Sequence, residues 1–428
     1  MFSFLRGLRR QPDFAKLWAG QTVSSFGSMF GALSLTALVY LHATPVQLGL
    51  LAMAQGLPVP LFALSAGVWI DRLPLRPILI VADVGRAVAL LTIPAAALFG
   101  VLHIEQLYTV AFVFGLLEVV FDIAYRSYLP ALVPSGELLD GNAKLSASES
   151  VAEIGSPAVG GALVQAVGGP GAVLVDALTF LWSAACVSLI RREHRRARRV
   201  EQHNMLEEIG EGLRAVWNDR ILRALTAANG TGRFFGGFYQ ALYALFLIRT
   251  LGFSPLIVGV TIGAGGVGSL GGALLAGRMT RRFGVGGTLL ISKLVPIGVL
   301  IPLAGGPPGL AFAMIFAAQL FGDPFWATYE ITSTSLRQSI TPERLLGRVT
   351  SSMVLVQAGL LPVGALVAGV LAQTVGVRET LWLAEIGPML AAAWLFFSPV
   401  PRIHALTIVD VQATVAVVPE LPTQFRDR

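Results

Sequence analysis

The sequence predicts an all-α integral membrane protein with twelve transmembrane helices, arranged as two six-helix bundles that are related by an internal repeat. Three observations support this fold. Of the 428 residues, 54% are hydrophobic and 13% are charged, whereas a soluble protein carries about 25% charged residues. The chain contains twelve apolar runs, each near or above the roughly 20 residues that a spanning helix needs. Similar segments also recur in the two halves of the chain.

The apolar runs are distributed over almost the whole chain. The first run is too long for a cleaved signal sequence, so we expect it to remain as the first spanning helix. Several runs exceed the minimum length, which indicates tilted or protruding helices. The expected spans are Phe14–His42, Val46–Ile70, Pro77–Gly100, Glu105–Pro130, Gly141–Gly168, Gly171–Ile190, Arg223–Thr250, Pro255–Gly277, Val285–Ala304, Pro308–Leu336, Leu346–Val375 and Glu379–Phe397.

Lysine and arginine residues gather at alternate connections between the runs. The intervening connections "HATP", "GGPG" and "GGPP" contain none, and Arg249 and Arg378 are the exceptions on that side. Because positively charged connections remain in the cytoplasm, both termini are expected to be cytoplasmic, in a multi-pass protein of the cell membrane. This bias explains the net charge of +6, so nucleic-acid binding is not indicated. The basic residues are Arg6, Arg9, Arg10, Lys16, Arg72, Arg76, Arg278, Arg281, Arg282, Arg344 and Arg348.

A long basic connection divides the chain. We expect an N-terminal bundle over residues 1–190, a linker over 191–220, a C-terminal bundle over 221–400 and a cytoplasmic tail over 401–428. The linker opens with "RREHRRARR", interpreted as a charge cluster at the lipid headgroups. Apolar residues at helical spacing follow, which predict an amphipathic helix on the cytoplasmic surface.

The two halves align as repeats. A shift of 206 residues places Arg72 on Arg278 and Gly141 on Gly347. A shift of 201 residues places Asp122 on Asp323. Internal duplication of this length is typical of two-bundle transporters.

Ionisable residues lie within runs that should be surrounded by lipid. Glu118, Asp122 and Arg126 are spaced four residues apart, so they share one face of a helix. A charge at this depth costs on the order of 3 kcal/mol, so this face must look into protein or a water-filled cavity. Asp323 and Glu330 repeat the pattern in the second half. Buried acids in both halves favour a transporter over a passive anchor.

The next predicted helix carries Glu149 and Glu153 at depths that match Arg126 and Asp122. Arg126 could meet Glu149, and Asp122 could meet Glu153, as a fixed ion-pair network. Alternatively, because four acids face Arg126 alone, a surplus carboxyl group could take up and release a proton. All four acids, including Glu118, are therefore proton-coupling candidates, of which Asp122 and Glu153 are favoured.

Residues expected at a substrate cavity follow from the same reasoning. In the second half, Arg233 and Asp323 should face a cavity and pair, with Glu330 nearer the cytoplasm. Aromatic residues cluster on the same helices, either as core and lipid-facing side chains or as a lining suited to bulky amphiphilic molecules, including cations. Asp83 and Arg86 should form a structural pair, whereas Asp176 and Glu385 have no assigned role. The cavity candidates are Tyr125, Arg126, Arg233, Tyr239, Asp323, Trp326, Tyr329 and Glu330.

Two motifs carry a family resemblance. The segment "GVWIDRLPLRP" contains Gly67, Asp71, Arg72 and Arg76, and it resembles the G-x-x-x-D-R-x-x-x-R signature of the major facilitator superfamily. That resemblance implies a cytoplasmic latch between the halves, although Gly277 replaces the acid in the second copy. The segment "GSPAVGG" resembles an antiporter signature, as a helix bend or, alternatively, as a generic small-residue packing face. Its residues are Gly155, Pro157, Gly160 and Gly161.

Longer segments narrow the resemblance to one branch. "DFAKLWAGQTVSSFGSMF", "NAKLSASESVAEIGSPAVGGALV" and "SLRQSITPERLLGRV" are similar to the macrolide-efflux and enterobactin-exporter branch. The resemblance implies proton-driven export of drug-like or siderophore-like small molecules by alternating access. Ser28 departs from the branch, because many of its members have an acid there. A lipid, lysophospholipid or nutrient transporter of the same fold is the alternative.

The sequence does not indicate an enzyme or a primary pump. It lacks the HExxH and GxSxG patterns, its five histidines lie in expected loops or tails, and its single cysteine, Cys186, cannot form an intramolecular disulfide. It also lacks a G-x-x-x-x-G-K-[ST] nucleotide loop. We therefore expect no metal and no cofactor. The expected partners are a small-molecule substrate, protons and membrane lipid, and the protein is expected to be a monomer.

Overall fold

The structure is a computed structural model that describes residues 12–28, 31–70, 73–133, 137–191, 205–295 and 297–405. Regular structure over these residues is entirely helical. The N-terminal half contains α2 (Pro12–Ser28), α3 (Ala32–Leu35), the π-helix η1 (Thr36–Tyr40), α4 (Pro45–Gly56), α5 (Pro58–Ile70), α6 (Leu75–Leu98), α7 (Ile104–Leu132) and α8 (Leu138–Ser188). The linker contains α9 (Met205–Asn218).

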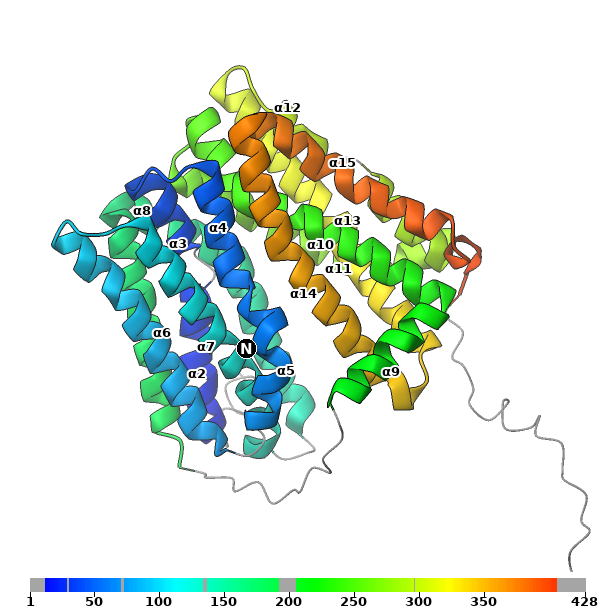
Figure 1. Cartoon of the computed structure of the whole chain (residues 1–428), viewed down its shortest axis with the longest axis horizontal. Coiled ribbons are helices and arrows are strands. Elements are labelled where there is room, and N and C mark those ends of the chain that lie inside the picture. The colour runs from blue at the N-terminus through cyan, green and yellow to red at the C-terminus, as the bar shows by residue number, and fades with distance from the viewer. Residues whose placement is uncertain are drawn as a thin grey trace, which may run out of the picture.

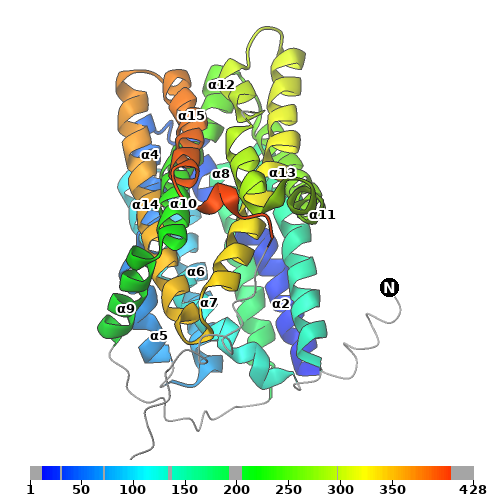
Figure 2. The same cartoon turned by 90° about the vertical axis from the view of Figure 1, so that its right-hand side faces the viewer.

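The C-terminal half has a similar sequence of elements. It contains α10 (Arg220–Leu245), the π-helix η3 (Phe246–Thr250), α11 (Pro255–Leu294), the short helices η4 (Ile297–Val299) and α12 (Leu300–Leu303), then α13 (Pro308–Ile340), α14 (Glu343–Thr374), α15 (Val377–Phe396) and η5 (Val400–Arg402). Figure 1 shows the two halves as two groups of long helices, and Figure 2 shows these helices running roughly parallel, with α9 at one end of the molecule.

The long helices account for twelve membrane spans within the described part of the chain. Eight segments are long and apolar enough to cross a membrane. Two of them, Leu138–Ser188 and Pro255–Leu303, contain 51 and 49 residues, about twice the length that one span needs. Each bends at a glycine with positive φ, Gly168 (φ 74°) and Gly284 (φ 72°), a conformation that disfavours side chains. With α10 and α15, these segments form the predicted all-α membrane fold.

The internal repeat is visible in local structure. Each half contains a π-helix at the end of its first span, η1 or η3, and then a capped helix that begins with proline. The Thr44 side chain accepts a hydrogen bond from Gln47 N before Pro45, and the Ser254 side chain accepts one from Ile257 N before Pro255. A hydroxyl cap and a proline in the first turn both favour a helix start. The two halves therefore share a local folding pattern as well as helix order.

The two halves contact each other through glycines. A Cβ atom placed on Gly259 would lie 1.9 Å from Pro157 O, and one on Gly161 would lie 2.2 Å from Pro255 O, so α8 and α11 touch backbone to backbone. Gly49 of α4 packs in the same way against α14. These contacts lie where α4 and α11 begin, which we name the contact end. At the opposite end, named the linker end, the two groups of ribbons diverge toward α5 and α9 (Figure 1).

Helix α9 occupies the predicted amphipathic part of the linker. Val216 is buried, whereas Trp217 is 71% exposed. Glu211 forms an ion pair with Arg348 at the start of α14, and Gly212 packs against the same helix. The linker helix is thus attached to the C-terminal half. The basic run before it and residues 406–428 of the tail lie outside the described residues.

Candidate functional site

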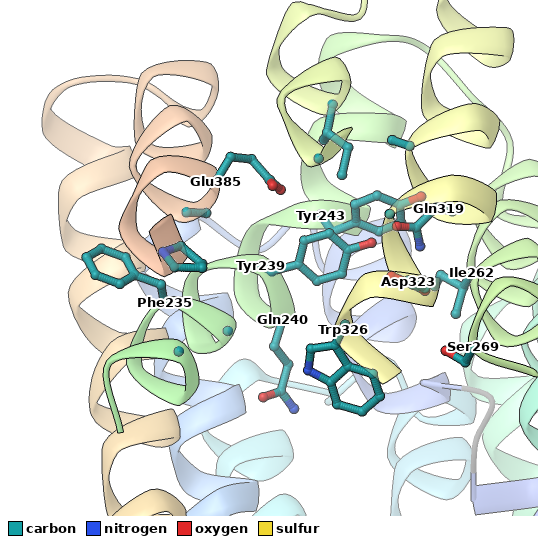
Figure 3. Close-up of a pocket in the computed structure, with 18 of the residues that line it drawn as sticks. Phe235, Tyr239, Gln240, Tyr243, Ile262, Ser269, Gln319, Asp323, Trp326 and Glu385 are labelled. Carbon is teal, nitrogen blue, oxygen red and sulfur yellow. The ribbon is translucent and has the colours of Figure 1, made fainter. Parts of the chain in front are cut away.

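A cavity of about 860 Å³ lies between the two halves. Most of its wall comes from α10, α11, α13 and α15 of the C-terminal half, and α3, α4 and α8 contribute from the N-terminal half. Figure 3 shows Tyr239, Tyr243 and Trp326 beside Asp323, with Glu385 on the neighbouring helix. The volume lies within the range of roughly 300–1,000 Å³ that is common for small-molecule sites. The charged lining residues are Glu153, Arg233, Lys293, Asp323, Glu330 and Glu385.

One region of the cavity is acidic. Asp323 of α13 is close enough to interact electrostatically with Glu153 of α8, and Glu385 of α15 is close enough to interact with Asp323. Over the described residues, none of these three carboxyl groups has a hydrogen bond or an ion pair, and no three metal-ligating side chains are close enough to hold a metal ion. The acidic region therefore joins both halves without an internal cation.

Glycines make room for two of these carboxyl groups. A Cβ atom on Gly265 would lie 2.0 Å from Asp323 Oδ2, and one on Gly298 would lie 1.8 Å from Glu385 Oε2. Any larger residue at either position would displace the carboxylate. The glycine-rich sequence of α11 thus positions Asp323, a role that its pattern alone did not reveal.

Aromatic side chains border the acidic region. The rings of Tyr239 and Tyr243 stack with their centroids 4.6 Å apart. Tyr243 OH donates a hydrogen bond to Thr261 Oγ1 at 2.9 Å, which fixes this pair against α11. Trp326 is 48% exposed, so its ring offers a large surface to the cavity. Rings next to unpaired carboxylates form a surface that suits amphiphilic or cationic molecules.

The other charged region of the cavity is balanced internally. Arg233 lies 3.9 Å from Glu330 in an ion pair. Lys293 Nζ lies 3.7 Å above the ring of Tyr329, whose hydroxyl donates a 2.7 Å hydrogen bond to Asn229 Oδ1. The expected pairing of Arg233 with Asp323 is therefore wrong. Glu330 is seven residues beyond Asp323, about two helical turns or 10 Å along α13, and Arg233 of α10 lies at the level of Glu330.

The N-terminal half contains a separate buried charge cluster. Arg86 pairs with Asp83, and both side chains are at most 5% exposed. Its guanidinium lies 4.3 Å from the Phe121 ring centroid and 4.4 Å from that of Phe180. It is also close enough to interact with acids on two other helices, namely Glu118, Asp122 and Asp176.

This cluster corrects the expected charge balance around α7. The prediction set four acids against Arg126 alone, but Arg86 is a second cation for two of them, Glu118 and Asp122. Arg126 is exposed, and it is close enough to interact with Asp122 and Glu149. Glu153 lies instead near Asp323, on the cavity. The i, i+3 spacing of Asp83 and Arg86 revealed their pairing, but nothing in the sequence showed that α7 and α8 surround them.

The cavity candidates divide into two groups. The residues that line the cavity are Arg233, Tyr239, Asp323, Trp326 and Glu330. Tyr329 is fully buried behind the lining, and Tyr125 is buried in the N-terminal half, where it stacks on Phe121 at 5.8 Å. Lys293 and Glu385 also line the cavity, although neither was among the expected lining residues. Their positions inside apolar runs were the available signal.

The described residues of the two sequence motifs contact neighbouring helices. Asp71 and Arg72 lie outside the described residues, and Gly67 belongs to α5. Arg76 donates hydrogen bonds to the backbone carbonyls of Val187, at 3.3 Å, and Ser188. In the second motif, Pro157 and Gly161 meet α11 at the contact end, with Gly160 buried and Gly155 beside Phe26. At this segment α8 therefore packs closely against α11.

Comparison with known proteins identifies relatives along nearly the whole chain. The chain matches the transmembrane secretion effector family over residues 5–424. It is 26% identical to "Multidrug efflux pump Tap" of Mycolicibacterium fortuitum, over 94% of this chain and 98% of that protein. It is 25% identical to "Macrolide efflux protein A" of Streptococcus pyogenes, over 87% of this chain and 92% of that protein.

Solved structures agree with the fold. A bacterial homologue of the iron transporter ferroportin in the inward-facing state superposes with a TM-score of 0.72 at 16% identity, over 90% of this chain and 98% of that chain. The outward-facing state of such a homologue gives a TM-score of 0.56 at 17% identity, over the same fractions. At these identities the likeness shows the fold alone. With the family match, it confirms the expected resemblance: the chain belongs to the transmembrane secretion effector family, multi-pass membrane transporters of the major facilitator superfamily.

Proposed function

We propose that this chain exports drug-like or siderophore-like small molecules across the cell membrane in exchange for protons, by alternating access. The observation that carries the proposal is the acidic region of the central cavity. Three carboxyl groups from both halves, those of Glu153, Asp323 and Glu385, meet there without a paired cation among the described residues. A cavity at the interface of two repeats is where such transporters bind their cargo.

The cavity wall favours one bulky, amphiphilic substrate molecule. Its volume of about 860 Å³ exceeds what an ion or a small nutrient needs. Trp326 and the stacked pair of Tyr239 and Tyr243 supply aromatic surface, and the unpaired acids supply negative charge. The relatives named for multidrug and macrolide efflux support the same class of substrate.

Alternating access is supported by the asymmetric contact between the halves. Glycine contacts close the contact end, whereas the halves diverge at the linker end (Figure 1). The basic residues Arg278 and Arg348 lie toward the linker end, which we therefore assign to the cytoplasm. The conformation is then inward-facing. Both termini are cytoplasmic in this orientation.

Proton exchange is assigned to Glu153 and Asp323. They lie on α8 and α13, in different halves, so rocking of the halves changes their separation. Two carboxylates held close together repel each other, and a proton bound by one of them removes the repulsion. Separation of the halves then releases that proton, and a cationic substrate group can take its place. Of the two favoured proton carriers, Glu153 and Asp122, the one on the cavity is Glu153.

The test is substrate-driven proton flux in proteoliposomes that contain a pH-sensitive dye. Macrolides, cationic dyes and siderophores are added under an imposed proton gradient. We expect flux with the wild type, and flux at the level of empty liposomes with Asp323→Asn and Glu153→Gln. Glu105→Gln, at the exposed start of α7, is the control and should retain flux. Substrate movement without proton flux, unchanged in both variants, would refute proton exchange and favour facilitated or lipid transport.

A further inference from the structure

A second cavity, of about 970 Å³, opens on the outer face of the C-terminal half between α10 and α15. Three arginines line one part of it, Arg220, Arg223 and Arg402. The rest of the lining includes Leu390 and Trp394, on the span α15. We name this cavity the α10–α15 groove. It shares no lining residue with the central cavity.

Helix direction places the three arginines at the same end of the groove. Helix α10 begins at Arg220, and α15 ends at Phe396 shortly before η5 (Val400–Arg402). The two helices pack against each other in opposite directions, so the start of α10 lies beside the end of α15 (Figure 1). From there, the groove continues along both spans past Ala227 and Leu390. The groove is therefore cationic at the membrane surface and apolar at membrane depth.

The guanidinium groups in the groove are available to a ligand. Among the described residues, the side chains of Arg220 and Arg402 have no hydrogen bond or ion pair. Arg223 uses one of its five N–H groups, with a 3.0 Å hydrogen bond to Trp217 O. Asp219 is not part of the lining, and its carboxylate accepts hydrogen bonds from Ile221 N and Leu222 N, both at 2.8 Å. Within the part of the chain that the structure describes, no acid lines the groove.

Large apolar side chains in the α10–α15 groove are exposed. Leu390 is 60% exposed, Trp394 54% and Phe397 86%. The Trp394 indole is held in place, because its Nε1 donates a 3.1 Å hydrogen bond to Thr231 Oγ1 on the facing helix. Exposed aromatic and aliphatic side chains on a membrane span and at its end match acyl chains in polarity.

We propose that the α10–α15 groove binds one anionic phospholipid. Its phosphate lies among Arg220, Arg223 and Arg402, and its acyl chains lie against Leu390, Trp394 and Phe397. Arginine suits this role because its planar group donates paired hydrogen bonds to phosphate oxygens. Phosphate carries the negative charge that three unopposed guanidinium groups need, and the apolar lining distinguishes a lipid from a soluble phosphate. The site is independent of the proposed proton exchange.

A bound lipid would also bridge two helices of the transport site. Helix α10 carries Arg233 and Tyr239, and α15 carries Glu385, all of which line the central cavity. The groove spans the contact between the two helices on their membrane side. Occupancy of the groove would therefore stabilise the arrangement of the cavity wall.

The test is native mass spectrometry of the full chain in detergent, with phosphatidylglycerol or phosphatidylcholine of identical acyl chains. We expect the wild type to retain one phosphatidylglycerol at concentrations at which phosphatidylcholine is retained about tenfold less. The triple variant Arg220→Gln/Arg223→Gln/Arg402→Gln should lose this preference. The matched control, Arg278→Gln/Arg281→Gln/Arg282→Gln, removes the same charge at the same end of the molecule and should keep the preference.

Other outcomes would overturn the proposal. Equal retention of the two lipids by the wild type would show that phosphate charge is not recognised. Equal loss of preference in both triple variants would assign binding to general surface charge. Competition by glycerol 3-phosphate at the same concentration as the lipid would assign the arginines to a soluble phosphate. If the triple variant does not fold, Arg402→Glu alone, beyond the last span, must reduce the preference.

Discussion

The two halves of the molecule contain the same kinds of charged residue but use them differently. Each half has a cation on its third span, the buried Arg86 in the first half and the half-buried Lys293 in the second. Each also has acids on its fourth and sixth spans. These are Glu118, Asp122 and Asp176 in the first half, and Asp323, Glu330 and Glu385 in the second.

The surroundings of these residues differ. Arg86 is enclosed by its ion pair with Asp83 and by two aromatic rings, and it is 4% exposed. Lys293 has one ring behind it and the central cavity in front. The first half therefore encloses Arg86 and Asp83 as internal structure and brings Glu153 to the cavity, whereas the second half presents Lys293, Asp323 and Glu385 to the site where a substrate would bind. The same arrangement of charged residues on the third, fourth and sixth spans can thus stabilise the core of one half and line the cavity in the other.

Replacing Arg86 and Lys293, one at a time, should give the largest difference in stability between the two halves. Arg86→Met leaves the Asp83 carboxylate buried without a partner, and loss of one member of a buried ion pair costs about 3–5 kcal/mol. We expect a marked loss of monodisperse protein and a lower midpoint of thermal unfolding in detergent. Lys293→Met is the matched variant, and its effect should be less than half as large, because Glu330 keeps its pair with Arg233. Equal destabilisation by the two variants would contradict the proposed division of roles.

Disturbing the glycine contacts between the halves should have a second, smaller effect, on the population of molecules with a closed contact end. Gly259→Ala places a Cβ atom 1.9 Å from Pro157 O. Overpacking of this kind destabilises a contact by about 1–3 kcal/mol. Because the clash exists only when α8 and α11 touch, the variant should shift the population away from the closed contact end, by about tenfold for each 1.4 kcal/mol. Gly271→Ala, on the same helix with nothing within 4 Å of the added atom, should leave the population unchanged.

This shift can be measured by electron–electron resonance between spin labels on Tyr40→Cys and Arg249→Cys, in a Cys186→Ser background. Both labelled positions are exposed and lie next to the contact end, one in each half. Gly259→Ala should lengthen the distance distribution, and Gly271→Ala should reproduce the parent distribution. An unchanged distribution with Gly259→Ala would show that these glycines do not hold the halves together.

The sequence was sufficient for the fold but not for the contacts between helices. Runs of apolar residues determine spans, since length and hydropathy are properties of each segment alone. The rotation and level of neighbouring helices depend on packing, and an offset of two turns along α13 makes Glu330, not Asp323, the partner of Arg233. For the same reason, the pair formed by Asp83 and Arg86, on one helix, was predictable, whereas its neighbours Phe180 and Asp176 were not. Features across helices need the structure.

The attachment of the linker helix α9 to the second half should give the smallest change in stability among these predictions. Helix α9 packs on α14 of the second half, through the ion pair of Glu211 and Arg348, whose side chains are 49% and 29% exposed. Exposed ion pairs contribute about 0.2–1 kcal/mol, so Glu211→Gln should change the unfolding midpoint only slightly. Gly212→Ala places a Cβ atom 2.4 Å from Arg348 O and should displace α9, seen as faster proteolysis of the linker. If Glu211→Gln alone speeds this proteolysis as much, charge rather than close packing attaches the linker to the second half.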